Sequence, residues 1–215
     1  MRKFGMMALT LGALACVTAD AQAQGQRRGF GGGRFMAGYA LLSNKSVQQE
    51  LKLDDTQAEK IGGVVRDINA KMREKIADIP QEERREKFAE LIRSTNEEIK
   101  TATKDELKPE QVRRLEQIIR QQSGIAAFAE PGTAEKLELS ADQKEKLREI
   151  ATETASKQRE LFESGNREEM REKSATIRKE AQEKAVAVLN DKQQGTWKEL
   201  LGAPFEVVRE DRPNN

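Results

Sequence analysis

The stretch LDDTQAEKIGGVVRDINAKMREKI, residues 53–76, decides the fold. Asp54 can cap a helix, Gln57 three residues later can reach back to the cap amide, and the apolar residues that follow recur at helical spacing. Leu53, directly before the cap, can hold the entering chain on apolar surface. This stretch predicts a long amphipathic helix from about residue 54 to residue 79.

Three further stretches repeat the same box, in which Leu is followed four residues later by Gln. They are LKPEQ at 107–111, LSADQ at 139–143 and LNDKQ at 189–193. The second residue of each box falls at the N-cap, where only Lys108 is a poor choice, and a proline at the first helical position follows it. The motif residues, which we expect to be structural caps without ligand contacts, are Leu53, Gln57, Leu107, Gln111, Leu139, Gln143, Leu189 and Gln193.

The boxes recur at matching spacings along the chain. The first and third boxes are 86 residues apart, the second and fourth are 82 apart, and the charged run EERREK at 82–87 returns as EEMREK at 168–173. A tandem duplication with four residues lost from the second copy explains these spacings. We therefore predict an all-α protein with helical modules at 41–124 and 125–202, each of two long helices and a shorter third, and a C-terminal tail at 203–215.

Composition supports this fold and narrows the chemistry. Charged residues make up 35% of the 215-residue chain and aromatic residues 4%, which favours long helices with a wide solvated face over a β sandwich or a doubly wound α/β enzyme. The chain has no His and a single Cys, so Ser-His-Asp and Cys-His catalysis are excluded and most zinc or copper sites are disfavoured. The methionines Met36, Met72 and Met170 are scattered. We expect no enzyme activity, no metal site and no cofactor.

The first 23 residues have the pattern of a secretory signal peptide. Arg2 and Lys3 precede an uncharged apolar run over 4–17, and the small residues around 21–23 suit a signal peptidase. We expect a periplasmic or otherwise exported mature chain, since no later stretch is apolar enough to span a membrane. A lipidated Cys16 is the alternative, although the chain lacks the leucine that a lipobox places at the third position before the cysteine.

Residues 24–40 predict a flexible Gly/Arg-rich tether. They contain Arg27, Arg28 and Arg34 without an acidic residue, and four glycines between 29 and 33. A plain spacer is favoured over weak attachment to anionic lipid or cell-wall polymer. Because the mature chain carries equal numbers of basic and acidic residues, we expect no nucleic-acid partner.

The paired boxes of this charged, helical chain resemble the LTxxQ-motif family of periplasmic proteins (Spy/CpxP-like) over about residues 47–202. Leu and Gln match at all four boxes, whereas Asp54, Lys108, Ser140 and Asn190 replace the family's threonine. The resemblance implies tandem duplicated Spy/CpxP-like modules in a curved helical bundle or cradle. Two modules in one chain would build that cradle as an internal pseudo-dimer, and a homodimer is compatible with it.

The same resemblance implies an ATP-independent, chaperone-like holdase that binds unfolded or aggregation-prone proteins. The alternative is an extracytoplasmic stress-response adaptor that docks on the periplasmic domain of a sensor kinase. Candidate client contacts are the basic residues of the two charged runs, which can equally be solvated residues in helix-surface ion pairs. They are Arg84, Arg85, Lys87, Arg171 and Lys173.

Overall fold

The computed structural model describes residues 38–163 and 167–208. The chain divides into two units, Met1–Gly32 and Gly33–Asn215, and every described residue belongs to the second unit. The predicted signal peptide, the predicted tether up to residue 37 and residues 209–215 lie outside the described part.

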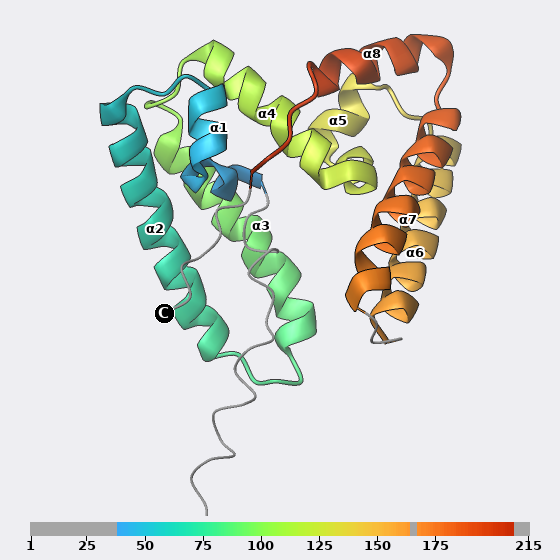
Figure 1. The fold of residues 1–215 in the computed structure, drawn as a ribbon, viewed down its shortest axis with the longest axis horizontal. Coiled ribbons are helices and arrows are strands. Elements are labelled where there is room, and N and C mark those ends of the chain that lie inside the picture. The colour runs from blue at the N-terminus through green and yellow to red at the C-terminus, as the bar shows by residue number, and fades with distance from the viewer. Residues whose placement is uncertain (1–37, 164–166, 209–215) are drawn as a thin grey trace, which may run out of the picture. The chain divides into compact units, whose positions relative to one another are not determined.

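The described residues form helices and their connections without a strand, which confirms the all-α class (Figure 1). Figure 1 labels the α-helices, and we label the two 3-10 helices η. In chain order the elements are η1 (Gly38–Ser43), α1 (Lys45–Glu50), α2 (Asp55–Ala77), α3 (Arg84–Thr103), α4 (Pro109–Ser123), η2 (Gly124–Ala129), α5 (Pro131–Lys136), α6 (Ala141–Glu163), α7 (Arg167–Ala187) and α8 (Asp191–Leu201).

One order of five elements occurs twice along this part of the chain. A 3-10 helix and a short α-helix precede two long α-helices and a final α-helix, and α2 and α6 have 23 residues each. Gly38 and Gly124, 86 residues apart, begin the two 3-10 helices with φ of 65° and 56°. The expectation of three helices per half was therefore incomplete, because it missed the 3-10 helix and the short α-helix in front of them.

The short helices α1 and α5 end in the same way. Lys52 and Glu138, which follow them, have φ of 51° and 50°, in the left-handed region that usually takes glycine. The amides of Leu53 and Leu139 each donate to the carbonyl oxygen five residues earlier, at 3.0 and 3.1 Å, as in a Schellman turn. These two motif leucines thus close one helix and lead the chain into the next.

The first hydrophobic core lies among η1, α1, α2, α3 and α4. Its fully buried side chains include Leu42, Ile61, Ile99, Leu115 and Ile118. Ala40 is also buried there, so residues 38–40 belong to η1 and not to the predicted tether. The Gly-rich sequence before these residues led to a predicted tether that ran past the start of η1.

The second core lies among η2, α5, α6, α7 and α8. It contains Ala127, Phe128, Leu137, Leu147, Leu189 and Trp197. The Phe128 and Trp197 rings pack with their centroids 4.2 Å apart, and Trp197 is only 2% exposed. In each half the long helices pack side by side, α2 with α3 and α6 with α7 (Figure 1).

Helix α4 contacts α8 and caps its C-terminal end. The last carbonyls of an α-helix have no partner within the helix. Here Gln117 donates to Glu199 O at 3.2 Å, and Gln121 donates to Leu201 O at 2.6 Å. Two glutamines four residues apart on one face of α4 therefore join the two halves of the repeat.

The glycines of α8 give a test of this packing. Gly195 lies inside the helix, and an added Cβ would have no neighbour within 4 Å, so Gly195→Ala is expected to raise the free energy of unfolding by about 0.5–1 kcal/mol. Gly202 ends α8 with φ of 62°, and its Cβ would clash with the Gln117 side chain. Gly202→Ala is expected to lower stability by at least about 1 kcal/mol, measured by urea unfolding. Equal effects of the two changes would contradict the predicted ending of α8.

Candidate functional site

Each motif glutamine closes the cap of its own helix. Gln57 Oε1 accepts from the Asp54 amide at 3.2 Å, and the Asp54 carboxylate accepts from the Gln57 amide at 2.8 Å. The same two bonds form in the Ser140 and Asn190 boxes, at 2.9–3.2 Å. At Lys108 only the glutamine half exists, with Gln111 Oε1 accepting from the Lys108 amide at 2.9 Å, because an ammonium group has no acceptor.

The glutamines also bond to one another in pairs, which the sequence spacing did not indicate. The two amide groups of Gln57 and Gln111 donate to each other at 3.2 and 3.3 Å. Those of Gln143 and Gln193 do so at 2.7 and 3.0 Å. Each pair joins the first long helix of one half to the last helix of the same half.

The paired amides also bind main-chain carbonyls of the neighbouring segments. Gln57 Nε2 donates to Glu106 O at 2.6 Å, and Gln111 Nε2 donates to Leu51 O at 3.1 Å. The second pair repeats this, with bonds of 3.0 Å to Val188 O and to Leu137 O. Three of the motif leucines are buried and Leu53 packs against the first core. The boxes are therefore the polar joints of the helical halves.

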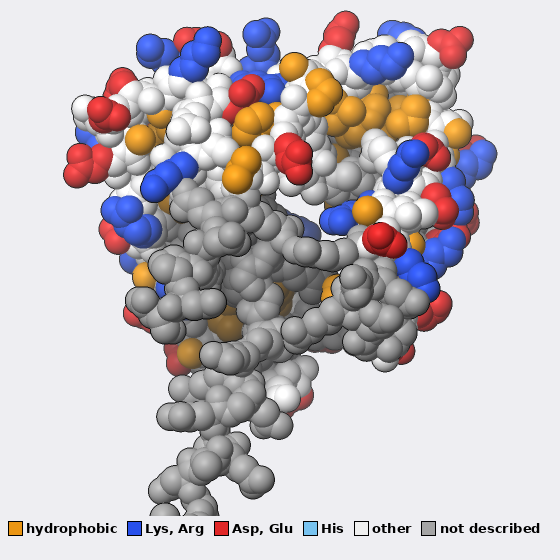
Figure 2. Space-filling model, viewed as in Figure 1, with side chains coloured by type: hydrophobic (Ala, Val, Ile, Leu, Met, Phe, Trp, Pro, Cys, Tyr) orange, Lys and Arg blue, Asp and Glu red, His pale blue; other side chains and the backbone are white. Residues whose placement is uncertain are grey.

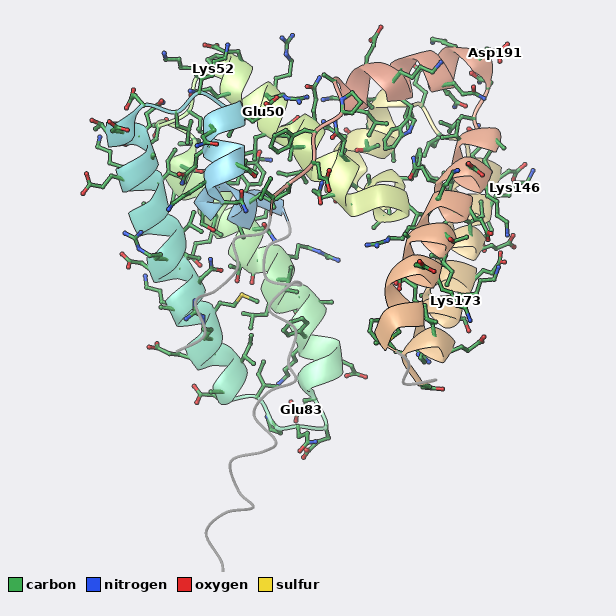
Figure 3. All side chains as sticks on the ribbon, in the orientation of Figure 1. Glu50, Lys52, Glu83, Lys146, Lys173 and Asp191 are labelled. Carbon is green, nitrogen blue, oxygen red and sulfur yellow. The ribbon has the colours of Figure 1, made fainter. Side chains whose placement is uncertain are left out.

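The helices α2 and α3 form one helical hairpin, and α6 and α7 form a second. The candidate client contacts lie near the free end of each hairpin, where the chain turns from one helix to the next. The side chains of Arg84, Arg85 and Arg171 lie outside the described part of the structure. Lys87 pairs with Glu83 at 2.6 Å, and the hydrogen bond to Glu83, followed by the charge of that carboxylate, raises the pKa of Lys87. Lys173 is exposed, close to the free end of α7 (Figure 3).

The two helical hairpins differ in the length of the turn that joins their helices. Six residues, 78–83, separate α2 from α3, whereas three, 164–166, separate α6 from α7. The second half is therefore three residues shorter at this turn. Lys87 is the fourth residue of α3 and Lys173 the seventh of α7, so the two lysines lie at different distances from the starts of their helices.

The free end of the α6–α7 hairpin also carries an exposed aromatic side chain. Phe162, the penultimate residue of α6, is 66% exposed. Its neighbour Leu161 is buried and lies on the apolar stripe of α6, so Phe162 points off that stripe. A large apolar residue out of phase with the helical period was the sequence signal for this position, and sequence reasoning missed it.

Charges of both signs lie along the top and the sides of the face drawn in Figure 2. Figure 2 shows Lys and Arg interspersed with Asp and Glu, and hydrophobic side chains gathered over α8. A mixed surface of this kind does not create a strong field of one sign. Apolar contact must therefore supply much of any binding to a partner.

A cavity of about 790 Å³ lies between α3, α4 and the start of α5. Arg120, 8% exposed, bonds in its wall to Glu116 at 3.1 Å and to Thr133 Oγ1 at 3.3 Å. Lys100 lies over the ring of Tyr39, 5.7 Å from its centroid. The lining contains three basic and three acidic side chains, so the cavity selects for neither anions nor cations.

Two side chains at this cavity, Tyr39 and Glu130, have raised pKa values. Burial, and then the negative charges of Glu116 and Glu97, raise the pKa of Tyr39 to about 12. Burial also raises the pKa of Glu130, while the nearby Arg120 guanidinium opposes that shift. Both shifts follow from placing an ionising group between the two halves of the repeat.

Tyr39 is the chain's one tyrosine, so its titration can be read directly. We expect tyrosinate absorbance near 295 nm to reach half its final value near pH 12 in the folded protein, and near pH 10 in denaturant. Since the folded form keeps this proton while the unfolded form loses it, stability should fall as the pH rises through that range. Titration near pH 10 in the folded protein would contradict the buried position of Tyr39.

The described residues hold no group of three or more His, Cys, Asp or Glu placed to bind a metal ion. Among the described helices, none combines the length and the apolar character needed to cross a membrane. Compared with known proteins, the chain matches no family model, no curated protein and no solved structure. The interpretation of the site therefore depends on its own geometry and on the resemblance of the boxes.

Proposed function

We propose that the chain is an exported, ATP-independent, chaperone-like protein that holds unfolded or aggregation-prone clients, built from two tandem copies of an LTxxQ-like module. The recurring order of five elements and the two glutamine pairs support the duplication. The resemblance then favours a cradle formed within one chain as a pseudo-dimer. Neither a nucleotide nor a metal takes part in this function.

The observation that carries the proposal is the exposed Phe162 at the free end of a charged hairpin. An aromatic side chain in water gains free energy when it contacts apolar segments of an unfolded chain. Exposed charges on the same hairpin, such as Lys173 of α7, keep the protein in solution and attract clients of mixed charge. Contacts of this kind are weak and do not depend on client sequence, as a holdase requires.

Aggregation of two unrelated, chemically denatured clients tests the proposal. Light scattering is followed without nucleotide, at ratios of purified mature protein from substoichiometric to equimolar. We expect both clients to be protected, and protection to fall only in part as salt screens the exposed charges. If neither client is protected at any ratio while one sensor-kinase domain binds saturably, the holdase is rejected in favour of the adaptor.

Export is tested separately by mass spectrometry of the protein recovered outside the cytoplasm. We expect a mature chain that begins at Gln24, because the small residues before it suit a signal peptidase. A chain that retains Met1 would contradict export through this signal. A chain that begins at a diacylated Cys16 would instead place the protein on a membrane surface.

A further inference from the structure

Residues 203–208, here called the strap, are more than the C-terminal tail that the sequence predicted. They follow α8 without forming a helix and lie against the first hydrophobic core, whose buried residues lie much earlier in the sequence, between positions 40 and 119. The surface that they contact, the strap site, includes Asn44, Ser46, Arg114 and Gln121.

Side chains of the strap site bind the strap mainly through the backbone atoms of the strap. Gln121 holds both sides of one peptide segment, because its Nε2 donates to Ala203 O at 2.8 Å and its Oε1 accepts from the Phe205 amide at 2.9 Å. At the other end Asn44 Nδ2 donates to Val208 O at 2.8 Å, and Ser46 Oγ accepts from the Val208 amide at 3.1 Å. Every residue type except proline offers both of these backbone groups.

The side chains of the strap alternate between the core and the solvent. Phe205 and Val207 pack against the first core, whereas Glu206 and Val208 are exposed. This is the period of two expected of an extended chain. Arg114 lies over the Phe205 ring, 6.0 Å from its centroid, and also donates to Ala203 O at 2.9 Å. The site therefore accepts an extended peptide with apolar side chains at two alternate positions.

We propose that the strap site binds extended segments of unfolded polypeptides, and that the strap occupies it as an internal competitor. Backbone recognition with two apolar anchors suits clients of many sequences, because such segments recur in most unfolded chains. The strap keeps the apolar surface covered until a client segment replaces it. This inference rests on the proposed holdase function and names a binding surface for it.

Anisotropy of fluorescein-labelled hexapeptides tests the proposal on the full mature chain. The probes are the strap sequence APFEVV, two unrelated peptides with apolar residues at positions 3 and 5, and a peptide with Asp at both positions. The variant Phe205→Ala/Val207→Ala loosens the strap, so we expect it to bind the three apolar peptides at least about tenfold more tightly than the wild type does. The Asp peptide should not bind, and adding Gln121→Ala should remove most of the gain.

Glu206→Ala is the matched control, because Glu206 is an exposed residue of the strap, and this variant should bind like the wild type. If the double variant does not fold by circular dichroism, Val207→Ala alone is measured in the same way. The proposal is overturned if the folded variant binds no more tightly than the wild type, if it binds only the strap sequence, or if it forms a dimer by exchanging straps. Wild-type protection of clients in light scattering, together with any of these results, would leave the holdase in place and remove only the strap site.

Discussion

Replacing Gln111 with alanine is expected to lower the free energy of unfolding by about 2–3 kcal/mol. Gln111 is 5% exposed. Its side-chain Oε1 accepts from the backbone amide of Lys108, and its Nε2 donates to Leu51 O and to the side-chain Oε1 of Gln57. Truncation removes one hydrogen bond from each of these buried or part-buried groups, and water does not easily replace the bond at Leu51 O. The loss is larger than the contribution of a single capping bond, because the pairing adds to the cap.

Gln122→Ala is the matched control, since Gln122 is an exposed residue of the same helix. It should change stability by no more than about 0.5 kcal/mol in the same urea titration. A double-mutant cycle with Gln57→Ala should give a coupling energy of about 0.5 kcal/mol or more, because each side chain bonds to the other. Additive effects of the two changes would show that the pair does not act as a joint.

Replacing Phe162 with serine is expected to weaken client protection about tenfold while the fold keeps its stability. The side chain is 66% exposed, so the free energy of unfolding should change by no more than about 0.5 kcal/mol. Burial of a phenylalanine side chain against a client contributes roughly 1.5–3 kcal/mol, and 1.4 kcal/mol already corresponds to a factor of about ten. The concentration of protein that halves client light scattering measures the effect.

Val208→Ser is the control for this change, because Val208 is the other large hydrophobic side chain that is exposed in the described part, at 61%. Its loss should leave client protection close to that of the wild type, since the strap binds through the Val208 backbone. If Phe162→Ser protects clients as well as Val208→Ser does, the hairpin end is not a contact surface.

Much of the helical framework follows from local signals in the sequence. The capping boxes at Asp54, Ser140 and Asn190 place the starts of α2, α6 and α8, and the apolar stripe after Gln57 places the buried face of α2. These features depend on residues within a few positions of one another. Capping residues and helical spacing therefore predicted these helices, and with them the all-α class.

The parts that sequence reasoning missed depend on contacts between distant segments. Lys52 and Glu138 adopt a conformation usually left to glycine, so the endings of α1 and α5 carried no recognisable signal. The glutamine pairs form only once α4 lies beside the start of α2, and α8 beside the start of α6. The short, mostly apolar run after Gly202 resembled a tail because its hydrogen-bond partners lie about 80 or more residues earlier.

The most direct measurement is hydrogen–deuterium exchange of the mature chain, alone and saturated with a permanently unfolded client. We predict that exchange slows at the end of α6 around Phe162 and in the first turns of α7, and stays unchanged in the middle of α2, where Val65 is buried. A complex that forms while exchange at the α6–α7 end stays the same would contradict the account, because the client would then bind elsewhere.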